Sequence, residues 1–309
     1  MGASHRLRRM EDRAFFLGCP IWAHAEWVGR FYRSDAKRSD YLPQYCSVFN
    51  AVEGNSTFYG LPPPESIARW TAGAPASFRF CFKFPRSVTH ELRLEGCDED
   101  VAQFLERIAP LGERVGPLLI QLPAAFGPAR LGALDAFLGN LPTHFTYAVE
   151  VRHRSFFAEG SEESELDSVL RTRGADRILF DTTGLFSSGT PLDDSTAEAL
   201  TKKPRVPRRR TVTAKSPIVR FVGDPDLARC RAPLRAWAAT VREWIDRRLT
   251  PFFFAHHAND TLSPEVARIF HEELFALGAG VSKPPAWPVE LQRAGMDRDD
   301  PDGQMAFFP

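Results

Sequence analysis

The sequence has no excess of charge of either sign and few cysteines. Its 39 basic residues balance its 39 acidic residues, which excludes a general electrostatic attraction to nucleic acid or to an anionic membrane. Its five cysteines include no CxxC pair, which argues against a zinc ribbon or a dithiol redox site. No apolar stretch approaches the length of a membrane span, and the polar, basic residues 1–13 do not resemble a signal peptide. We therefore expect a cytoplasmic protein that does not bind membranes.

The motifs of three large ligand-binding classes are also absent. The chain contains no GxxxxGKS, GxxxxGKT, GxGxxG or GxSxG pattern, which disfavours a nucleoside-triphosphatase, a dinucleotide-binding enzyme and an α/β-hydrolase. What is present is a chain of 309 residues with 43% hydrophobic content, which is enough for a large buried core. α/β barrels of this size often form one domain.

Short apolar runs alternate with helical patterns along the chain. The predicted strands are residues 15–19, 48–53, 78–84, 117–122, 145–151, 177–181, 217–222 and 251–257. The predicted helices are residues 39–45, a helix from residue 64, and residues 98–114, 131–141, 163–173, 233–249 and 264–277. Near-continuous apolar strands are typical of a parallel sheet that is buried on both faces. Eight β/α steps predict an α/β fold, a single (β/α)8 TIM barrel.

Three segments depart from this rhythm. The barrel domain should span residues 14–281, after a polar extension over residues 1–13. Residues 184–216 form a Ser-, Pro- and Arg-rich insertion between strands six and seven. The Pro- and Asp-rich tail, residues 282–309, would either pack on the barrel or be partly disordered.

Several predicted strands end abruptly in charged or amide residues. Residues two apart on a strand share a face, so Glu53 with Asn55, and Glu150 with Arg152, would project together. Polar groups are costly to bury, and in parallel α/β proteins the usual reason for this placement is a ligand site beyond the strand ends. We predict that six residues converge in one pocket at the carboxyl-terminal face: Glu53, Lys83, Gln121, Glu150, Asp181 and Arg220.

Five segments in one order carry a family resemblance. They read Glu53-Gly-Asn-Ser-Thr-Phe-Tyr59 with Leu61-Pro62, Phe78-Arg-Phe-Cys-Phe-Lys-Phe-Pro-Arg86 with Thr89-His90, Gly116-Pro-Leu-Leu-Ile-Gln-Leu-Pro123, Val149-Glu-Val-Arg-His-Arg-Ser155 and Ile218-Val-Arg220. With them the chain resembles the domain of unknown function 72 family, the YecE-like proteins, over essentially its whole length. The resemblance implies a TIM barrel and supplies no activity. The first loop, Trp22-Ala-His-Ala-Glu-Trp27, and the strand end His256-His257 depart from the family pattern, and there we expect substrate differences.

Glu53, Glu150 and Lys83 are the catalytic candidates. The two carboxylates could form a general acid/base pair, as in glycoside hydrolysis. The alternative is that Lys83 or Arg152 neutralises them as part of the structure. Desolvation in a phenylalanine-rich strand would lower the pKa of Lys83 and could make it a Schiff-base amine or a general base. An ion pair with either carboxylate would instead keep it charged, for an electrostatic role.

The predicted binding residues suit a polar, anionic substrate. Guanidinium groups match carboxylate or phosphate, amides and Asp181 could orient the substrate, and aromatic residues in loops could stack on a sugar or base or close the core. The predicted substrate-binding residues are Trp22, Asn55, Tyr59, His90, Gln121, Arg152, Asp181, Arg220 and His257.

Three functions are compatible with these residues. The first is an enzyme that uses acid/base chemistry on a small anionic, sugar- or nucleotide-like substrate. The second is a nucleic-acid-binding or regulatory module that uses the basic loop, residues 202–210. The third is a metal-dependent isomerase or phosphodiesterase, because the strand ends carry carboxylates and imidazoles. The chain has no compact metal-ligand spacing, so we predict no metal ligands and leave the cofactor open.

Overall fold

Eight parallel strands lie at the eight predicted positions, and none extends more than one residue beyond its predicted range. They are β1 (Phe16–Gly18), β2 (Ala51–Gly54), β3 (Arg79–Phe82), β4 (Leu118–Gln121), β5 (Tyr147–Glu150), β6 (Asp176–Asp181), β7 (Ile218–Val222) and β8 (Phe252–His256). The parallel pairing agrees with the near-continuous apolar character of the strands.

The computed structural model describes most of the chain. The described residues are 15–186, 197–198, 200–201 and 205–296. The predicted extension over residues 1–13, residues 202–204 of the basic loop and residues 297–309 of the tail lie outside them.

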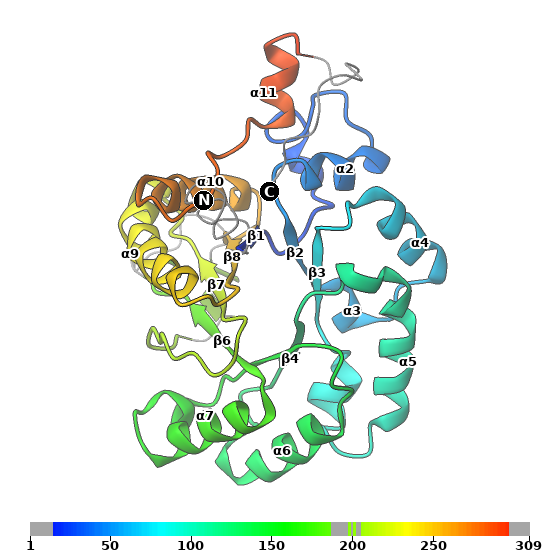
Figure 1. Cartoon of the computed structure of the whole chain (residues 1–309), viewed down its shortest axis with the longest axis vertical. Helices are drawn as coiled ribbons and strands as arrows, with labels where there is room; N and C mark the ends of the chain where they lie inside the picture. Colours follow the sequence, from blue (N-terminus) through cyan, green and yellow to red (C-terminus); the bar gives the residue numbers. More distant parts are fainter. Residues whose placement is uncertain (1–14, 187–196, 199, 202–204, 297–309) are drawn as a thin grey trace, which may run out of the picture.

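Helices surround the strands in the view down the molecule (Figure 1). The α-helices are α2 (Tyr41–Cys46), α3 (Ser56–Tyr59), α4 (Pro64–Gly73), α5 (Asp98–Ile108), α6 (Leu131–Asn140), α7 (Ser161–Arg173), α9 (Leu227–Asp246), α10 (Ser263–Ala276) and α11 (Pro288–Arg293). Shorter helical turns are η1 (Ala25–Trp27), η2 (Arg38–Asp40), η3 (Ser87–Glu91), η4 (Ala109–Arg114), η5 (Pro128–Arg130) and η6 (Arg154–Phe157). α9 begins at Leu227 rather than at the predicted Pro233, because the side chain of Asp226 caps it by accepting from the backbone of Ala228 (3.0 Å).

The strands form two sheets rather than the single closed ladder of the predicted TIM barrel. In spatial order, β1, β8, β7, β6, β5 and β4 form a curled six-strand sheet, and β2 pairs with β3 in a separate two-strand sheet. The small sheet lies between β1 and β4, the two edges of the large sheet (Figure 1). The structure is therefore an α/β fold with a curled, parallel six-strand sheet. Breaks in the hydrogen-bonded ladder separate the pair β2 and β3 from both edges of that sheet.

Side chains bridge the junction between β1 and β2. The backbone N–H of Leu17 donates to Oδ1 of Asn50 (2.7 Å). The backbone N–H of Cys19 donates to the hydroxyl of Tyr45 (2.7 Å), which donates in turn to the carbonyl of Ala51 (3.0 Å). These bonds satisfy backbone N–H and carbonyl groups that would pair with each other in a regular ladder. Apolar periodicity cannot predict them, because the polar atoms come from outside the two strands.

The junction between β3 and β4 is limited to isolated contacts. The backbone N–H of Gly116 donates to the carbonyl of Phe80, and that of Phe84 donates to the carbonyl of Leu119, each at 2.9 Å. Two isolated parallel bridges accompany these bonds. The small sheet is thus attached to both edges of the large sheet without a continuous ladder.

The inner face of the strands carries a buried apolar layer. Alternate residues of a strand share a face, so a residue two positions before a polar strand end lies on the same side. One buried cluster contains Ala51, Cys81, Leu119, Ala148, Ile218 and Phe254. These residues precede, by two positions each, Glu53, Lys83, Gln121, Glu150, Arg220 and His256. The polar strand ends therefore lie next to an apolar floor on the inner side of the sheets.

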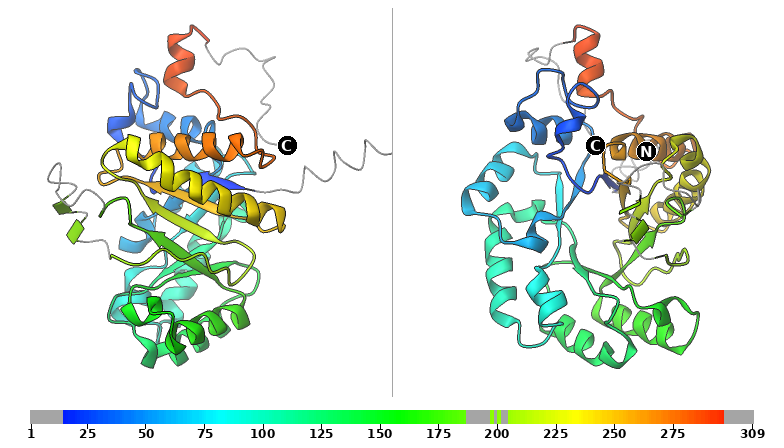
Figure 2. Two further views of the ribbon diagram at one scale, coloured as in Figure 1. Left: turned by 90° about the vertical axis from the view of Figure 1, so that its left-hand side faces the viewer. Right: turned by 180° about the vertical axis from the view of Figure 1, so that it is seen from behind.

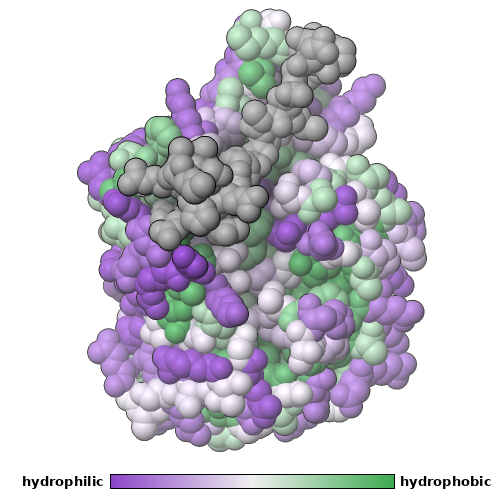
Figure 3. All heavy atoms as spheres, in the orientation of Figure 1, coloured by the Kyte–Doolittle hydropathy of each residue, from purple (hydrophilic) through white to green (hydrophobic). Residues whose placement is uncertain are grey.

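The outer faces of the strands pack against the helices. α9 and α10 lie side by side over the large sheet (Figure 2), and the ring of Phe270 on α10 stacks on Phe253 of β8 with centroids 3.6 Å apart. On the face shown in Figure 3, hydrophilic residues gather along the outer edges, and hydrophobic residues show between them near α4 and α5. The helices thus present polar sides to solvent and apolar sides to the strands.

Gly18 should be essential for the approach of β1 to β2. A Cβ atom at Gly18 would lie 2.0 Å from the carbonyl oxygen of Ala51. We expect Gly18→Ala to lower the free energy of unfolding by about 3 kcal/mol, because backbone atoms must move apart. The matched control is Gly132→Ala in α6, where a Cβ meets no atom within 4 Å and alanine favours the helix. Urea unfolding curves that shift equally for both variants would contradict this account.

Candidate functional site

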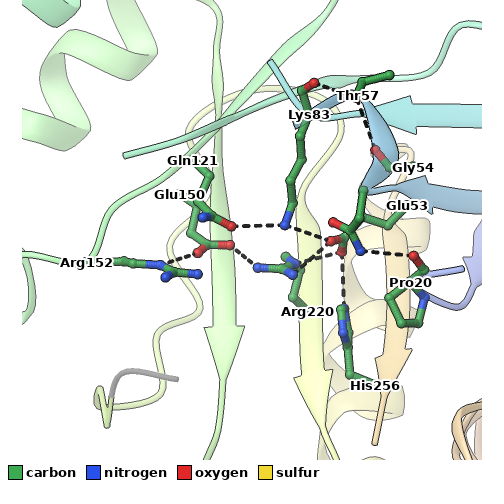
Figure 4. Close-up of polar contacts among 11 residues, drawn as sticks. Pro20, Glu53, Gly54, Thr57, Lys83, Gln121, Glu150, Arg152, Arg220 and His256 are labelled. Atoms are coloured by element: carbon green, nitrogen blue, oxygen red, sulfur yellow. Dashed lines mark hydrogen bonds and ion pairs between the residues drawn. The ribbon is translucent and has the colours of Figure 1, made fainter. Parts of the chain in front are cut away.

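The core of the candidate site is a bridge between two glutamates. Arg220 of β7 donates from Nε and Nη2 to the two carboxylate oxygens of Glu53 on β2, at 2.7 and 2.8 Å. Its third nitrogen, Nη1, donates to Oε2 of Glu150 at the end of β5. Figure 4 shows the guanidinium between the two carboxylates. One side chain thus connects the small sheet to the large one.

Lys83, which follows β3, and Arg152, which follows β5, extend this bridge. Nζ of Lys83 donates to Oε1 of Gln121 (3.0 Å) and lies 3.3 Å from Oε1 of Glu53. Nε of Arg152 donates to Oε1 of Glu150 (2.8 Å). Gln121 and Glu150 are register partners on β4 and β5, which brings their side chains together. We call the set Glu53, Lys83, Gln121, Glu150, Arg152, Arg220 and His256 the charged cluster.

His256, rather than the predicted His257, faces the charged cluster. Nε2 of His256 lies 3.1 Å from Oε2 of Glu53 (Figure 4). The next residue, His257, points to the other side, where Nδ1 contacts Oδ1 of Asn259 (3.2 Å). The strand alternation explains the correction, because one position changes the face. Arg220 pairs with Phe254, and His256 lies two residues further along the same face of β8. The sequence could have identified His256 only if this strand pairing had been known.

Phe180 also belongs to the site, although it was not among the residues predicted from the sequence. Its ring lies under two cations, with its centroid 4.9 Å from the guanidinium carbon of Arg220 and 6.0 Å from that of Arg152. Phe180 is the register partner of Arg220, so the two residues share the inner face. An apolar residue at the end of β6 gave no polar signal in the sequence.

The charged cluster is deeply buried, and its most exposed side chains are those of Arg152 and Lys83, on the side that we call the open edge. Glu53 is 0% exposed and Glu150 is 1% exposed, whereas the side chain of Arg152 is 22% exposed and that of Lys83 is 10% exposed. Two carboxylates face three cations, Lys83, Arg152 and Arg220, which leaves one positive charge. Because Arg152 and Lys83 are the most accessible of these groups, the excess charge lies on the open edge.

The cations control the ionisation of both glutamates. Burial alone would raise the pKa of Glu53, but Arg220, Lys83 and His256 outweigh it and hold the pKa well below its usual range. Burial likewise opposes the charge on Glu150, while Arg220, Arg152 and Lys83 lower its pKa to about 2. Both carboxylates are therefore ionised at neutral pH.

The pKa of Lys83 is shifted toward neutral pH. Burial, assisted by the charge of Arg220, lowers the pKa of Lys83 to about 8, and Glu53 and Glu150 limit this shift. An amine with this pKa exchanges its proton readily at physiological pH. Burial also acts on Arg220, but the two glutamates raise its pKa above the usual value, so it remains charged.

Asp181 does not join the charged cluster. Its Oδ2 accepts from the indole nitrogen of Trp237 on α9 (2.7 Å), and its Oδ1 accepts from the backbone of Thr183 (2.9 Å). Asp181 is the register partner of Phe221 and so lies on the helix side of β6. The prediction of six converging residues is thus wrong for Asp181, because it is one position out of phase with Phe180.

Tyr59 and His90 lie on a rim beyond β2 and β3. The ring of Phe58 contacts both, with centroids 5.2 Å from Tyr59 and 5.1 Å from His90. Tyr59 is 82% exposed, which is unusual for a large aromatic residue. Burial, followed by the charges of Arg152 and Arg86, lowers the pKa of His90. The effect of Arg152 indicates that the rim is near the open edge of the charged cluster.

Trp22 and Asn55 lie away from the open edge. Trp22 packs edge-on against Trp70 of α4 and against Phe80, with centroids 5.3 and 5.8 Å apart. Asn55 turns its Nδ2 to the carbonyl of Pro20 (3.0 Å). Both residues line a cleft of about 750 Å³ beside the small sheet.

The basic loop is partly engaged in contacts within the protein. Arg208 lies over the ring of Trp237, 4.2 Å from its centroid. Arg209 pairs with Glu163 (2.8 Å), while Arg205 and Arg210 are exposed. Lys202 and Lys203 lie outside the described residues. Arg208 and Arg209 belong to the loop that was predicted to bind nucleic acid, and both already contact other residues of the protein.

Two features are absent from the part of the chain that the structure describes. No group of three or more His, Cys, Asp or Glu residues there is arranged to hold a metal ion. No helix there is both long and apolar enough to cross a membrane.

The fold and the charged cluster define a parallel α/β protein with a buried polar site at the carboxyl ends of its strands. Residues 16–290 match the family described as "Protein of unknown function DUF72". The chain is 38% identical over 275 residues to the UPF0759 protein YecE of Escherichia coli strain K12, a match that covers 89% of this chain and 98% of YecE. The YecE protein of Escherichia coli O157:H7 matches to the same extent. The chain belongs to the DUF72 family, as its motifs predicted.

Two solved structures of DUF72 family proteins have a similar fold. The protein from Thermotoga maritima MSB8 is 26% identical, with a TM-score of 0.64, and the match covers 85% of this chain and 99% of that chain. The protein from Enterococcus faecalis V583 is 19% identical, with a TM-score of 0.63, and the match covers 84% and 95%. At that identity, the second likeness shows the fold alone.

The stability that Glu150 contributes should depend on pH. Its folded pKa of about 2 lies below the usual value of 4.5, so the contribution is complete above about pH 4.5 and is lost as the pH falls toward 2. We expect Glu150→Gln to cost about 3 kcal/mol at pH 7, because Arg220 and Arg152 each lose a charged partner, and to cost less at pH 3.

Denaturant unfolding at a series of pH values measures this difference. The control is Glu243→Gln, which removes an exposed partner of Arg247 and should cost less than about 0.5 kcal/mol throughout. A cost of Glu150→Gln that does not change between pH 7 and pH 3 would contradict the assignment.

Proposed function

We propose that the protein is an enzyme that performs acid/base chemistry on a small, anionic, sugar- or nucleotide-like substrate. The observation that carries the proposal is the excess of one positive charge among Lys83, Arg152, Arg220, Glu53 and Glu150. This excess lies on the open edge of an otherwise buried cluster. A phosphate or carboxylate bound there would complete the charge balance, and a guanidinium such as that of Arg152 suits such a group.

We assign proton transfer to Lys83 rather than to the two glutamates. Acid/base glycoside hydrolysis requires one carboxylic acid with a raised pKa, whereas Glu53 and Glu150 both have lowered pKa values. Lys83, with its pKa of about 8, can accept or donate a proton close to neutral pH. The glutamates then hold Lys83 and Arg220 in place and keep them charged in the resting site.

The residues around Lys83 would position the substrate. Gln121 contacts Lys83 directly and offers amide groups to substrate hydroxyls. Arg152 would bind the anionic group. Tyr59 and His90 on the rim offer ring faces to a sugar or base. Asn55, which contacts Pro20, would act by holding the first loop.

We further propose that the two sheets act as one interrupted (β/α)8 barrel. The single domain would span residues 14–281, with the charged cluster at its carboxyl-terminal mouth. The parallel order of the strands and the placement of polar residues at their ends support this interpretation, because TIM-barrel enzymes bind their substrates at that face.

Replacing Lys83 should slow turnover strongly. Lys83→Arg keeps the positive charge but raises the pKa beyond the useful range, so we expect a loss of roughly two to four orders of magnitude in rate. The wild-type rate should change with pH around pH 8, the pKa of Lys83. The measurement is a screen of phosphorylated sugars, uronic acids and nucleotides, followed by the pH profile of any reaction found.

The matched control is Lys215→Arg, at an exposed lysine that precedes β7. It should retain the full rate. Turnover that survives in Lys83→Arg would rule out the proton-transfer role of Lys83. Anion binding that survives in Arg152→Ala, measured by titration with the substrate found, would rule out the role of Arg152.

A further inference from the structure

The cleft beside the small sheet meets the charged cluster at Glu53, and Asp260 also lines it. Most of its lining comes from the first loop, η2, α2 and α4. The rings of Phe80 and Phe82 on β3 stack against Trp70 of α4, with centroids 6.1 and 5.6 Å apart. They therefore point to the helices, whereas Cys81 and Lys83, which alternate with them, point to the inner side. Trp22 and Trp70 line the cleft from the helix side. The cleft thus extends from Glu53 of the charged cluster to the helix side of the small sheet.

Two arginines line this cleft without a carboxylate partner. Arg38 of η2 and Arg69 of α4 are both exposed, and neither forms an ion pair within the described ranges. Nη2 of Arg69 donates to the hydroxyl of Ser66 (2.7 Å), which leaves its other donors available. Two guanidinium groups on one cleft provide several donors with the geometry that phosphate oxygens accept.

The remainder of the lining suits a ring that carries hydroxyl groups. Trp22 and Trp70 are half-buried and provide aromatic surface. Asn55, also in the lining, has a buried Oδ1 with no hydrogen-bond partner among the described residues, and buried acceptors of this kind usually have one. The volume of about 750 Å³ lies in the range of small-molecule sites.

We propose that this cleft is a binding site for a small phosphorylated ring compound. Arg38 and Arg69 hold the phosphate, and Trp22 and Trp70 contact the ring. The site shares Glu53 with the charged cluster but holds its ligand through other residues, so it does not rest on the proposed enzymatic function.

Phenyl phosphate tests both parts of the proposal, because it combines a phosphate with a flat ring. The full chain, labelled with fluorotryptophan, is titrated with phenyl phosphate, inorganic phosphate and phenol, and the fluorine signals of Trp22 and Trp70 are identified by substitution with Phe. We expect saturable binding of phenyl phosphate that shifts both signals and is tighter than the binding of either fragment. Arg38→Ala and Arg69→Ala should each weaken it about tenfold or more, the effect of one charge-assisted hydrogen bond.

The matched control is Arg242→Ala on α9, on the other side of the molecule (Figure 1), where an exposed arginine pairs with Asp246. It removes the same charge and should leave binding unchanged. Equal weakening by Arg242→Ala, or no saturable binding below about 10 mM, would overturn the proposal. Binding that is lost in Arg152→Ala but kept in Arg38→Ala and Arg69→Ala would place the phosphate at the charged cluster instead, and would also overturn it.

Discussion

The bridge that Arg220 forms between Glu53 and Glu150 is the interaction on which the inner side of the molecule depends. Each of these charges is buried, and a buried charge without a partner costs several kcal/mol. Arg220 has enough donors to serve both carboxylates at once, and Phe180 supports its guanidinium from below. The bridge also crosses from the small sheet to the large one, so the same contact that balances charge links the two sheets.

The apolar layer beneath the charged cluster makes these charges effective. Because little water reaches the inner side, electrostatic interactions there are stronger than at the surface. The same burial lowers the pKa of Lys83 to about 8, while the glutamates keep the amine from losing its charge altogether. A cluster designed only for stability would gain more from apolar residues of similar volume. The anionic ligand proposed above would balance the excess positive charge at the open edge.

The small sheet carries two different surfaces. Its inner side supplies Glu53 and Lys83 to the charged cluster, and its outer side packs against the aromatic residues that line the cleft. The alternation of residues along β3 assigns each side chain to one of these surfaces. The side chains of Asn50 and Tyr45, which link β1 to β2, leave the small sheet attached but not fused to its neighbour.

The sequence by itself determined the order and the approximate positions of the strands, the family, and most of the charged cluster. Local periodicity and polar strand ends are properties of neighbouring residues, so Glu53, Lys83, Gln121, Glu150 and Arg220 could be identified from them. The tertiary structure decided the rest. It placed His256 rather than His257, and Phe180 rather than Asp181, on the inner face, because the face of a strand residue depends on register with its neighbours. It also joined Arg220 to Glu53 across 167 positions of the sequence, a contact that exists only because the sheet curls.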